Sequence, residues 1–170
     1  MTEIEKFVDL LNDFRFCMMT TEGADGRWHT RPMTLQDPTE DRAIWFVAVR
    51  DSKSAANLRH SHRLQLSFLR SSDGAWISIW GRAELDDKVE HLRQLWKDNW
   101  DIWFDEADKF ERAVLVNVEP IQIEFWEPKK GRFHQFADMI KARYSDSSIT
   151  FDESVHRLRV SAQDLAEAAR

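Results

Sequence analysis

The stretch 31–61 reads RPMTLQDPTEDRAIWFVAVRDSKSAANLRHS, and we interpret the remainder of the chain outward from it. Residues 31–35 and 43–48 have the apolar character of two strands. A polar bend at 49–51 leads into a helix that begins at Ser52 and Lys53. A helix start presents free backbone N–H groups and the positive end of a dipole, so it attracts phosphate. The stretch therefore predicts a phosphate-binding corner between a strand and a helix.

Four residues of this stretch bear on the corner. Asp51 is of a type that caps helices well, while Ser52 and Lys53 add a hydroxyl and a cation beside the free amides. Arg31 would complete a site for a phosphate monoester if its strand lies beside the helix start. The simpler alternative is a strand arginine and a helix that happens to begin with Asp-Ser-Lys, because helix starts of this kind are common.

The order R-P-M-T-L, then W-F-V, then D-S-K resembles the flavin-binding segment of the pyridoxamine 5'-phosphate oxidase-like proteins, and most closely their general stress protein branch. The likeness continues in WISIWGRAEL at 76–85, in the Trp-rich stretch after it and in IEFW at 123–126. It covers about residues 5–135. The resemblance implies a mostly β (α+β) fold, an FMN-binding split β-barrel with flanking helices. It also implies a homodimer with FMN sites at the interface.

The resemblance also implies roles for single residues. Members of the family place an Arg and a Lys on the FMN phosphate, at positions that match Arg31 and Lys53. Their motif reads Ser-Arg-Lys or Ser-Pro-Lys where this chain has Asp-Ser-Lys, so the individual role of Ser52 stays open. Other positions line the flavin ring, with strand packing as an alternative or additional role: Met33, Thr34, Phe46 and Val47.

A second group of residues resembles the Ile-Glu-Phe-Trp … Arg-Leu-His segment of the true pyridoxamine-phosphate oxidases. Trp126 matches a tryptophan that contacts FMN, and Arg132 and His134 match residues that contact the substrate. For His134 alone, a polar surface role is the simpler alternative.

The chain also departs from the true oxidases at two places. Phe136 stands where those enzymes carry a further flavin-contacting arginine, and Trp76 or Ile77 replaces a glutamine of their flavin-contacting strand. Phenylalanine offers no hydrogen-bond donor in place of arginine. Both differences argue against a strict pyridoxamine-phosphate oxidase.

Composition limits the class of protein. The chain has 170 residues, of which 42% are hydrophobic and 32% charged, with a formal net charge of −6. The mixed charges contain no basic block, so we expect no nucleic-acid partner, and no apolar run approaches membrane-spanning length. The N-terminal residues lack a signal-peptide pattern, and Cys17 is the single cysteine. We therefore expect a cytoplasmic protein without a membrane partner.

We divide the chain into an FMN-binding split barrel at 1–136 and a C-terminal extension at 137–170 that packs on the barrel, with no role assigned. Apolar periodicity predicts one long helix from Asp86 or Asp87 to Phe104, and its tryptophans are expected to form part of the dimer interface. Pro32 predicts an edge or a bulge for its strand. The spacing predicts a first helix at 3–14 and strands at 16–21, 28–35, 43–48, 64–68, 76–85, 113–118 and 121–126, with a further short strand at 155–160.

No side-chain pattern names a catalytic residue. The histidines and carboxylates show neither metal-ligand spacing nor an acid–base pair, and nucleophile motifs are absent. The first hypothesis is therefore an FMN-binding redox protein, an oxidase or reductase of an unidentified small molecule, in which the cofactor supplies the chemistry. The alternatives are a non-catalytic flavin-binding stress protein and a split barrel that holds haem or a deazaflavin.

Overall fold

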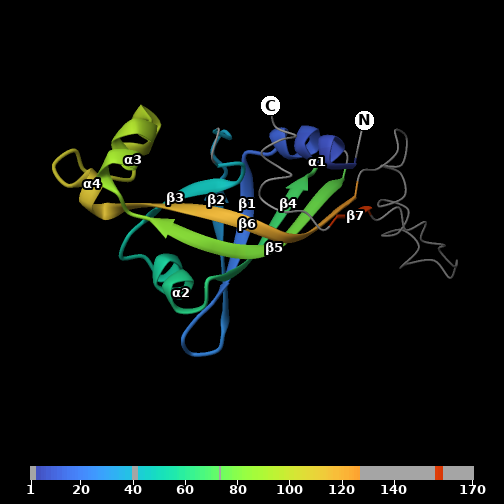
Figure 1. Ribbon diagram of the computed structural model, residues 1–170, viewed down its shortest axis with the longest axis horizontal. Coiled ribbons are helices and arrows are strands. Elements are labelled where there is room, and N and C mark those ends of the chain that lie inside the picture. Colours follow the sequence, from blue (N-terminus) through green and yellow to red (C-terminus); the bar gives the residue numbers. More distant parts are fainter. Residues whose placement is uncertain (1–2, 40–41, 73, 127–155, 159–170) are drawn as a thin grey trace, which may run out of the picture.

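The computed structural model describes residues 3–39, 42–72, 74–126 and 156–158. These residues form a mostly β structure with flanking helices (Figure 1), which confirms the expected fold class. The helices are α1 (Glu3–Asn12), α2 (Lys53–Ser61), α3 (Val89–Leu95) and α4 (Lys109–Arg112), with a 3-10 turn η1 (Asp98–Trp100). The strands are β1 (Phe16–Glu22), β2 (Trp28–Thr34), β3 (Trp45–Val49), β4 (Arg63–Arg70), β5 (Ala75–Asp86), β6 (Ala113–Trp126) and β7 (His156–Leu158).

One seven-stranded antiparallel sheet organises the described residues, in the order β2-β1-β4-β5-β6-β3 with β7 paired to β6. The two ends of this order, β2 and β3, are in contact, so the sheet curls towards closure. Pro32 lies in β2, which has a strand neighbour on one side among the described residues. The edge position predicted from Pro32 is therefore confirmed, because proline cannot donate to a second ladder.

The main core lies on the inner face of the curled sheet. Strand residues alternate between the two faces, so each strand sends every second side chain inward. In β1 these are Cys17, Met19 and Thr21, which are all buried. Helix α1 covers one end of the core with an amphipathic face, and its buried residues are Phe7, Leu10 and Leu11.

The predicted long helix after β5 is wrong. Helix α3 ends at Leu95, and Trp96 adopts an extended backbone with φ −59° and ψ 134°. The Trp96 ring meets those of Trp100, Phe104 and Phe110 edge to face, at centroid distances of 5.3, 5.5 and 5.1 Å. Packing of these aromatic rings on one another stabilises the folded turn more than continuation of the helix would. We call residues 89–112 the aromatic lobe.

The predicted break between two strands at 119–120 is also wrong, because β6 runs through Pro120 without interruption. The irregularity is instead a register shift, because Trp80 and Gly81 of β5 pair with Gln122 and Pro120 and leave Ile121 of β6 without a partner on β5. A Cβ added at Gly81 would lie 2.5 Å from the carbonyl oxygen of Glu119. Glycine is needed there because the two backbones approach closely.

The short strand predicted at 155–160 is present as β7, which pairs with Ile123 and Phe125 of β6. The remainder of 137–170 and the boundary near residue 136 lie outside the described residues. Within the described ranges, none of the helices is both long enough and apolar enough to cross a membrane.

Candidate functional site

Helix α2 begins at the corner that the sequence singled out. Its N-cap is Ser52, whose Oγ accepts a hydrogen bond from Ala55 N at 3.3 Å. The expectation that Asp51 caps the helix is wrong, because Ser52 N donates to Val49 O at 3.0 Å and this turn brings Ser52 into the cap position. The amides at the two positions after the cap have no acceptor within the helix. They remain available to an anion.

Arg31 lies on the inner side of the β2 edge. It is directly opposite the fully buried Met19 on β1, and opposed residues of an antiparallel pair share one face. Its Nε is buried and has no hydrogen-bond partner among the described residues. Burial lowers the pKa of the Arg31 guanidinium, yet arginine stays charged at neutral pH. A buried charged donor without an acceptor suits an anionic ligand.

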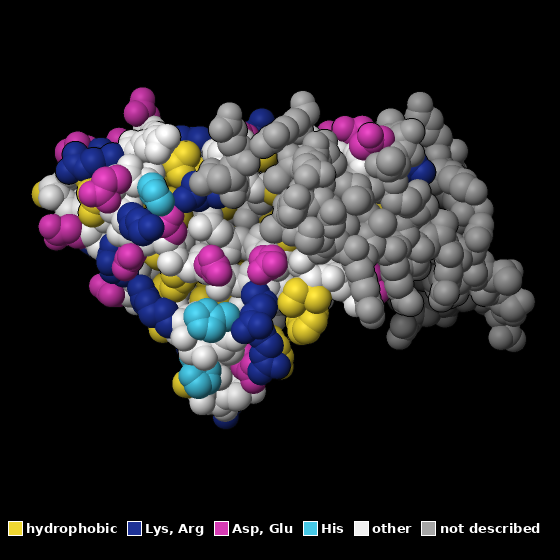
Figure 2. Space-filling model, viewed as in Figure 1, with side chains coloured by type: hydrophobic (Ala, Val, Ile, Leu, Met, Phe, Trp, Pro, Cys, Tyr) yellow, Lys and Arg dark blue, Asp and Glu magenta, His cyan; other side chains and the backbone are white. Residues whose placement is uncertain are grey.

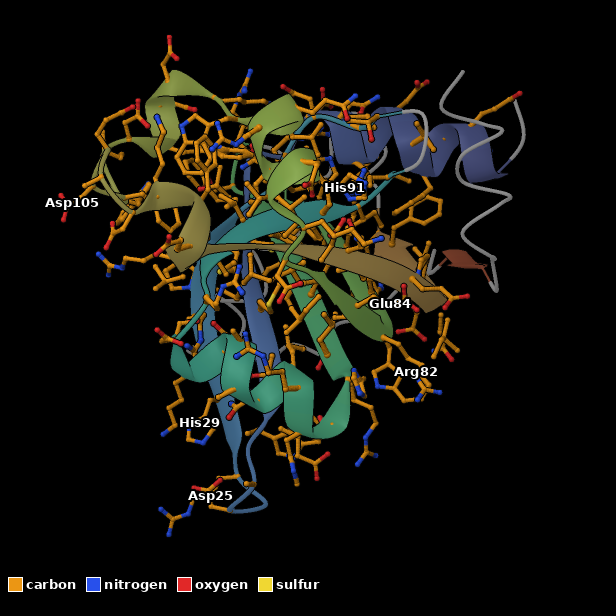
Figure 3. All side chains as sticks on the ribbon, turned by 60° about the vertical axis from the view of Figure 1, so that its left-hand side comes forward. Asp25, His29, Arg82, Glu84, His91 and Asp105 are labelled. Atoms are coloured by element: carbon orange, nitrogen blue, oxygen red, sulfur yellow. The ribbon has the colours of Figure 1, made fainter. Side chains whose placement is uncertain are left out.

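Helix α2 packs beside Arg31 through a polar contact with β1. Asn57 Nδ2 donates to Thr21 Oγ1 at 3.0 Å. Thr21 lies opposite His29 on β2, two positions from Arg31 and on the same face. Figure 3 shows His29 next to α2. The inner face of β2 therefore adjoins the helix.

Lys53 lies on the same side of α2 as the contact with β1, since it precedes Asn57 by one helical turn. The pKa of Asp25, in the β1–β2 hairpin, is lowered first by the hydrogen bond from Arg27 N, with smaller contributions from His29 and from the charge of Lys53. The charge of Lys53 therefore acts on the hairpin that carries Arg31. We call Arg31, Ser52, Lys53 and the first amides of α2 the phosphate corner. Cations and histidines gather on the face that carries α2 (Figure 2).

The four ring-lining candidates fall into different places. Met33 shares the inner face of β2 with Arg31 and is half-buried against the main core, while Thr34 is exposed on the opposite face. Phe46 is 0% exposed, so only its main chain is available to a ligand. Val47 is half-buried against the core of the aromatic lobe. Met33 is therefore the apolar side chain that shares both strand and face with Arg31.

Trp126 lies far from the phosphate corner in the same chain. Strand β6 begins beside the corner, where Arg50 N donates to Arg112 O at 2.6 Å, and runs for 14 residues to Trp126. At about 3.3 Å per residue, the strand spans roughly 40 Å. One chain therefore does not bring Trp126 to its own phosphate corner.

Trp126 is instead next to a second group of exposed side chains. It pairs with Trp76 on β5, which is 43% exposed, whereas Ile77 is buried. Of the two candidates for the altered glutamine position, Trp76 is the one on the exposed face. Neighbouring outward side chains on β1, β4 and β5 are also large and exposed. We call this set the outer apolar face, and it consists of Phe16, Met18, Leu69, Trp76 and Trp80.

The remaining sequence candidates, Arg132 and His134, lie outside the described residues, as does Phe136.

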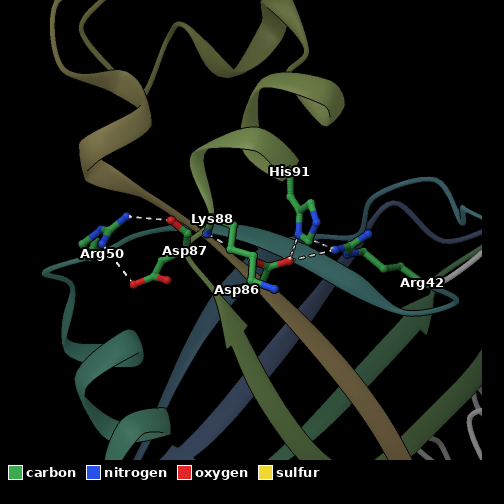
Figure 4. Close-up of polar contacts among 6 residues, drawn as sticks. All are labelled: Arg42, Arg50, Asp86, Asp87, Lys88 and His91. Carbon is green, nitrogen blue, oxygen red and sulfur yellow. Dashed lines mark hydrogen bonds and ion pairs between the residues drawn. The ribbon is translucent and has the colours of Figure 1, made fainter.

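A polar cluster at the end of β5 was missed by sequence reasoning (Figure 4). Asp86 Oδ2 accepts hydrogen bonds from Arg42 Nη2 at 2.8 Å and His91 Nδ1 at 2.6 Å. Burial raises the pKa of Asp86, but the hydrogen bonds from His91, Lys88 N and Arg42 outweigh it, so the net pKa is lowered. His91 is 5 residues away, on the helix that follows β5, whereas Arg42 is 44 residues away and is brought to Asp86 by the fold.

Asp87 takes a different partner, since its Oδ2 accepts from Arg50 Nη1 at 3.1 Å. Consecutive aspartates at a predicted strand end were the signal that could have drawn attention to this cluster. In the part of the chain that the structure describes, no three His, Cys, Asp or Glu side chains are arranged to hold a metal ion.

Taken together, the phosphate corner offers hydrogen-bond donors of several kinds: a guanidinium, an ammonium, a hydroxyl and main-chain amides. It can bind and orient a phosphate monoester. The titratable pair nearest these donors is His29 with Asp25, whose Nε2 and Oδ1 atoms lie 3.4 Å apart in the β1–β2 hairpin. Redox chemistry would have to come from the bound molecule.

Solved structures with this architecture come from several bacteria. They include general stress protein 26 of Bacillus anthracis str. Sterne, with 14% identity over 75% of this chain and 97% of that chain and a TM-score of 0.60. A Clostridium acetobutylicum protein related to general stress protein 26 has 16% identity, coverages of 72% and 89%, and a TM-score of 0.61. A pyridoxamine 5'-phosphate oxidase-related, FMN-binding protein of Nostoc punctiforme has 16% identity, coverages of 73% and 80%, and a TM-score of 0.55. These likenesses establish the split-barrel fold.

No curated protein matches the chain significantly. A family model does match it: the one described as pyridoxamine 5'-phosphate oxidase like aligns with residues 2–149. The match spans most of the 170 residues and includes the phosphate corner, the aromatic lobe and β6. The chain therefore belongs to the pyridoxamine 5'-phosphate oxidase-like family.

Proposed function

We propose that the protein binds FMN and acts as a flavin-dependent oxidase or reductase of a small molecule. The observation that carries the proposal is the buried Nε of Arg31, which has no acceptor among the described residues and lies on the face that adjoins the start of α2. A phosphate monoester would supply that acceptor. Family membership and the FMN-binding protein of Nostoc punctiforme support the choice of flavin.

Each residue of the phosphate corner has a distinct part in this proposal. Arg31 donates from the sheet edge and Lys53 from the helix, beside the free amides of the first turn. Ser52 fixes the helix start through its bond from Ala55 N, and its Oγ lies 3.3 Å from Ser54 Oγ. Its main role is therefore to shape the corner. Met33 and Val47, both half-buried, would border the ring.

When bound, FMN supplies hydride and electron transfer, and the chain supplies position and electrostatics. The corner favours FMN over haem, because the donors are matched to phosphate. It also favours FMN over a dinucleotide, since the chain has 5 glycines and none forms a Gly-rich dinucleotide turn.

We further propose that the protein is a homodimer in which Trp126 contacts the flavin held by the partner. The length of β6 keeps Trp126 from its own phosphate corner, so a second copy is needed for this contact. The outer apolar face adjoins Trp126 through Trp76 and is suited to be covered by that copy. We place the interface there and not on the aromatic lobe, because the lobe packs most of its rings internally.

The substrate is proposed to be a small molecule other than pyridoxamine phosphate. Of the two residues that can match the altered glutamine, Trp76 is the exposed one and Ile77 is buried, and neither side chain reproduces both the donor and the acceptor of an amide. FMN-loaded protein under air is expected to form negligible pyridoxal phosphate. Steady-state turnover of pyridoxamine phosphate at about 0.1 per second or faster would contradict this part of the proposal.

The decisive experiment is aerobic purification followed by a visible spectrum and mass analysis of the released cofactor. FMN as the main species supports the proposal, whereas FAD, haem or a deazaflavin would contradict it. Reduction of the bound flavin by NAD(P)H then separates a redox enzyme from a flavin-binding stress protein without turnover. The similarity to general stress protein 26 keeps that second candidate open.

A further inference from the structure

Arg50 joins the phosphate corner to the body of the barrel. Its Nη1 donates to Asp87 Oδ2 at 3.1 Å, and its Nη2 donates to the carbonyl oxygens of Asp87 and Ala113, each at 3.4 Å. One side chain thus connects the residue after β5, the first residue of β6 and the bend that precedes α2. Figure 4 shows the contacts of Arg50 with Asp87.

The main chain of Arg50 is held at the same place. Its N–H donates to Arg112 O at 2.6 Å, and its carbonyl oxygen accepts from Arg59 Nη1 of α2 at 2.9 Å. The bend closes with the bond from Ser52 N to Val49 O at 3.0 Å. Residues 49–52 are therefore fixed from the sheet on one side and from the helix on the other.

We propose that Arg50, assisted by Asp87, is a positioning residue that holds the start of α2 in the geometry required for the FMN phosphate. The inference rests on the proposed function. Hydrogen bonds weaken steeply when the donor direction departs from the acceptor, so the first-turn amides bind an anion well only if the bend is fixed. A bend that is already ordered does not have to be ordered on binding, which improves affinity.

The neighbouring aspartate provides a matched control. Asp86 and Asp87 are consecutive but bind different partners. Asp86 binds Arg42 in the loop before β3 and His91 in α3. Asp87 binds Arg50 on the side of α2. Asp86→Asn weakens the contacts with Arg42 and His91, and Asp87→Asn weakens the contact with Arg50. Only the Asp87 change affects the bend.

The experiment compares Arg50→Met, Arg50→Lys, Asp87→Asn and Asp86→Asn. Affinities for FMN and for riboflavin, which lacks the phosphate, are measured by fluorescence quenching. Arg50→Met is expected to weaken FMN binding about tenfold and leave riboflavin binding unchanged. The FMN affinity of Arg50→Lys should fall between those of Arg50→Met and wild type. Asp87→Asn should lose about twofold to threefold in FMN affinity, because the carboxylate is exposed. Asp86→Asn should leave the ratio of FMN affinity to riboflavin affinity unchanged.

A residue with a merely structural role would lower both affinities together, and that result overturns the inference. An unchanged FMN-to-riboflavin ratio in Arg50→Met overturns it as well. If Arg50→Met fails to fold, Asp87→Asn decides, since an exposed Asp-to-Asn change does not threaten folding.

Amide hydrogen exchange on the ligand-free protein provides a readout that does not depend on flavin. The amides of Ser52 and Ala56 are hydrogen-bonded in the structure and are expected to exchange faster in Arg50→Met than in wild type and in Asp86→Asn. A wild-type protein that binds neither flavin overturns the proposed function, and equal exchange in all variants then overturns the positioning role of Arg50.

Discussion

The phosphate corner and the aromatic lobe lie at the same end of the barrel, but they differ in how their buried hydrogen-bond donors are paired. In the lobe, Trp96 Nε1 donates to Asp101 at 2.8 Å, Trp100 Nε1 donates to Gln36 at 3.2 Å, and Lys109 is paired with two carboxylates. In the corner, Arg31 Nε is buried without an acceptor among the described residues. A region whose donors are satisfied contributes stability, whereas one with an unsatisfied buried donor has sacrificed stability and suits a ligand.

The largest effect should come from the lobe. Trp100 is 3% exposed and packs edge to face on Trp45 and Trp96. Trp100→Ala is expected to lower the free energy of unfolding by about 3–5 kcal/mol, because it leaves a cavity and removes the donor to Gln36 Oε1. Denaturant unfolding measures this loss. Trp103→Ala is the control, since Trp103 is 69% exposed and its replacement should cost within about 0.5 kcal/mol. Similar losses in both variants would show that the lobe is not a packed core.

The next effect tests where two copies meet. Phe16 lies on the outer apolar face and is 66% exposed, while Ile102 lies on the lobe and is 77% exposed. Phe16→Asp is expected to weaken dimerisation by about 2–4 kcal/mol, because it buries a charge at an apolar contact. Ile102→Asp should leave dimerisation unchanged. Sedimentation equilibrium measures both. Dissociation by Ile102→Asp and not by Phe16→Asp would return the interface to the lobe, where the sequence had placed it.

The sequence predicted the corner better than the lobe, and the reason is the range of the interactions. The helix start follows from neighbours within a few residues, so a polar bend was enough to locate it, although the cap is Ser52 and not Asp51. Pro32 limited β2 to an edge or a bulge, and the strand order places it at the edge. The lobe depends on contacts between residues distant in sequence, such as Trp45 with Trp100, and helical spacing of apolar residues cannot distinguish a helix from a folded aromatic cluster.

The same distinction explains which site residues were found. Arg31 and Lys53 came from a motif, but the faces on which side chains lie required strand register. Phe46 is fully buried, and Thr34 points away from the face of Arg31. Arg50 was read as part of a polar bend, because its partner Asp87 lies 37 residues further on and at the end of another strand.

A smaller effect should separate binding from stability within the corner itself. Arg31→Ala and Lys53→Ala are each expected to weaken FMN binding by about 1.5–3 kcal/mol, roughly tenfold to a hundredfold, since each removes a charge-assisted contact. The ligand-free Arg31→Ala protein should unfold at a temperature no lower than wild type, because a partly buried cation without an acceptor at its Nε is removed. Fluorescence titration and thermal unfolding measure the two quantities. A large loss of stability with unchanged flavin affinity would make Arg31 a structural residue.

The smallest expected effect tests whether the inner face of β2 excludes solvent as well as the aromatic lobe does. Cys17 lies opposite Met33, two positions from the strand partner of Arg31, and burial raises the pKa of its thiol from 9.0 to about 12. Between about pH 9 and 12 the folded state therefore keeps the thiol proton while the unfolded state loses it. The contribution of the buried thiol to the free energy of unfolding is complete below about pH 9 and falls as the pH rises towards 12. Between pH 9 and 10 the wild type should lose up to about 1 kcal/mol more unfolding free energy than Cys17→Ala. Urea unfolding measures both losses. Equal losses in the two proteins would mean that solvent reaches Cys17 through an open β2 edge. The inner face of β2 beside the phosphate corner would then not be packed as closely as the aromatic lobe.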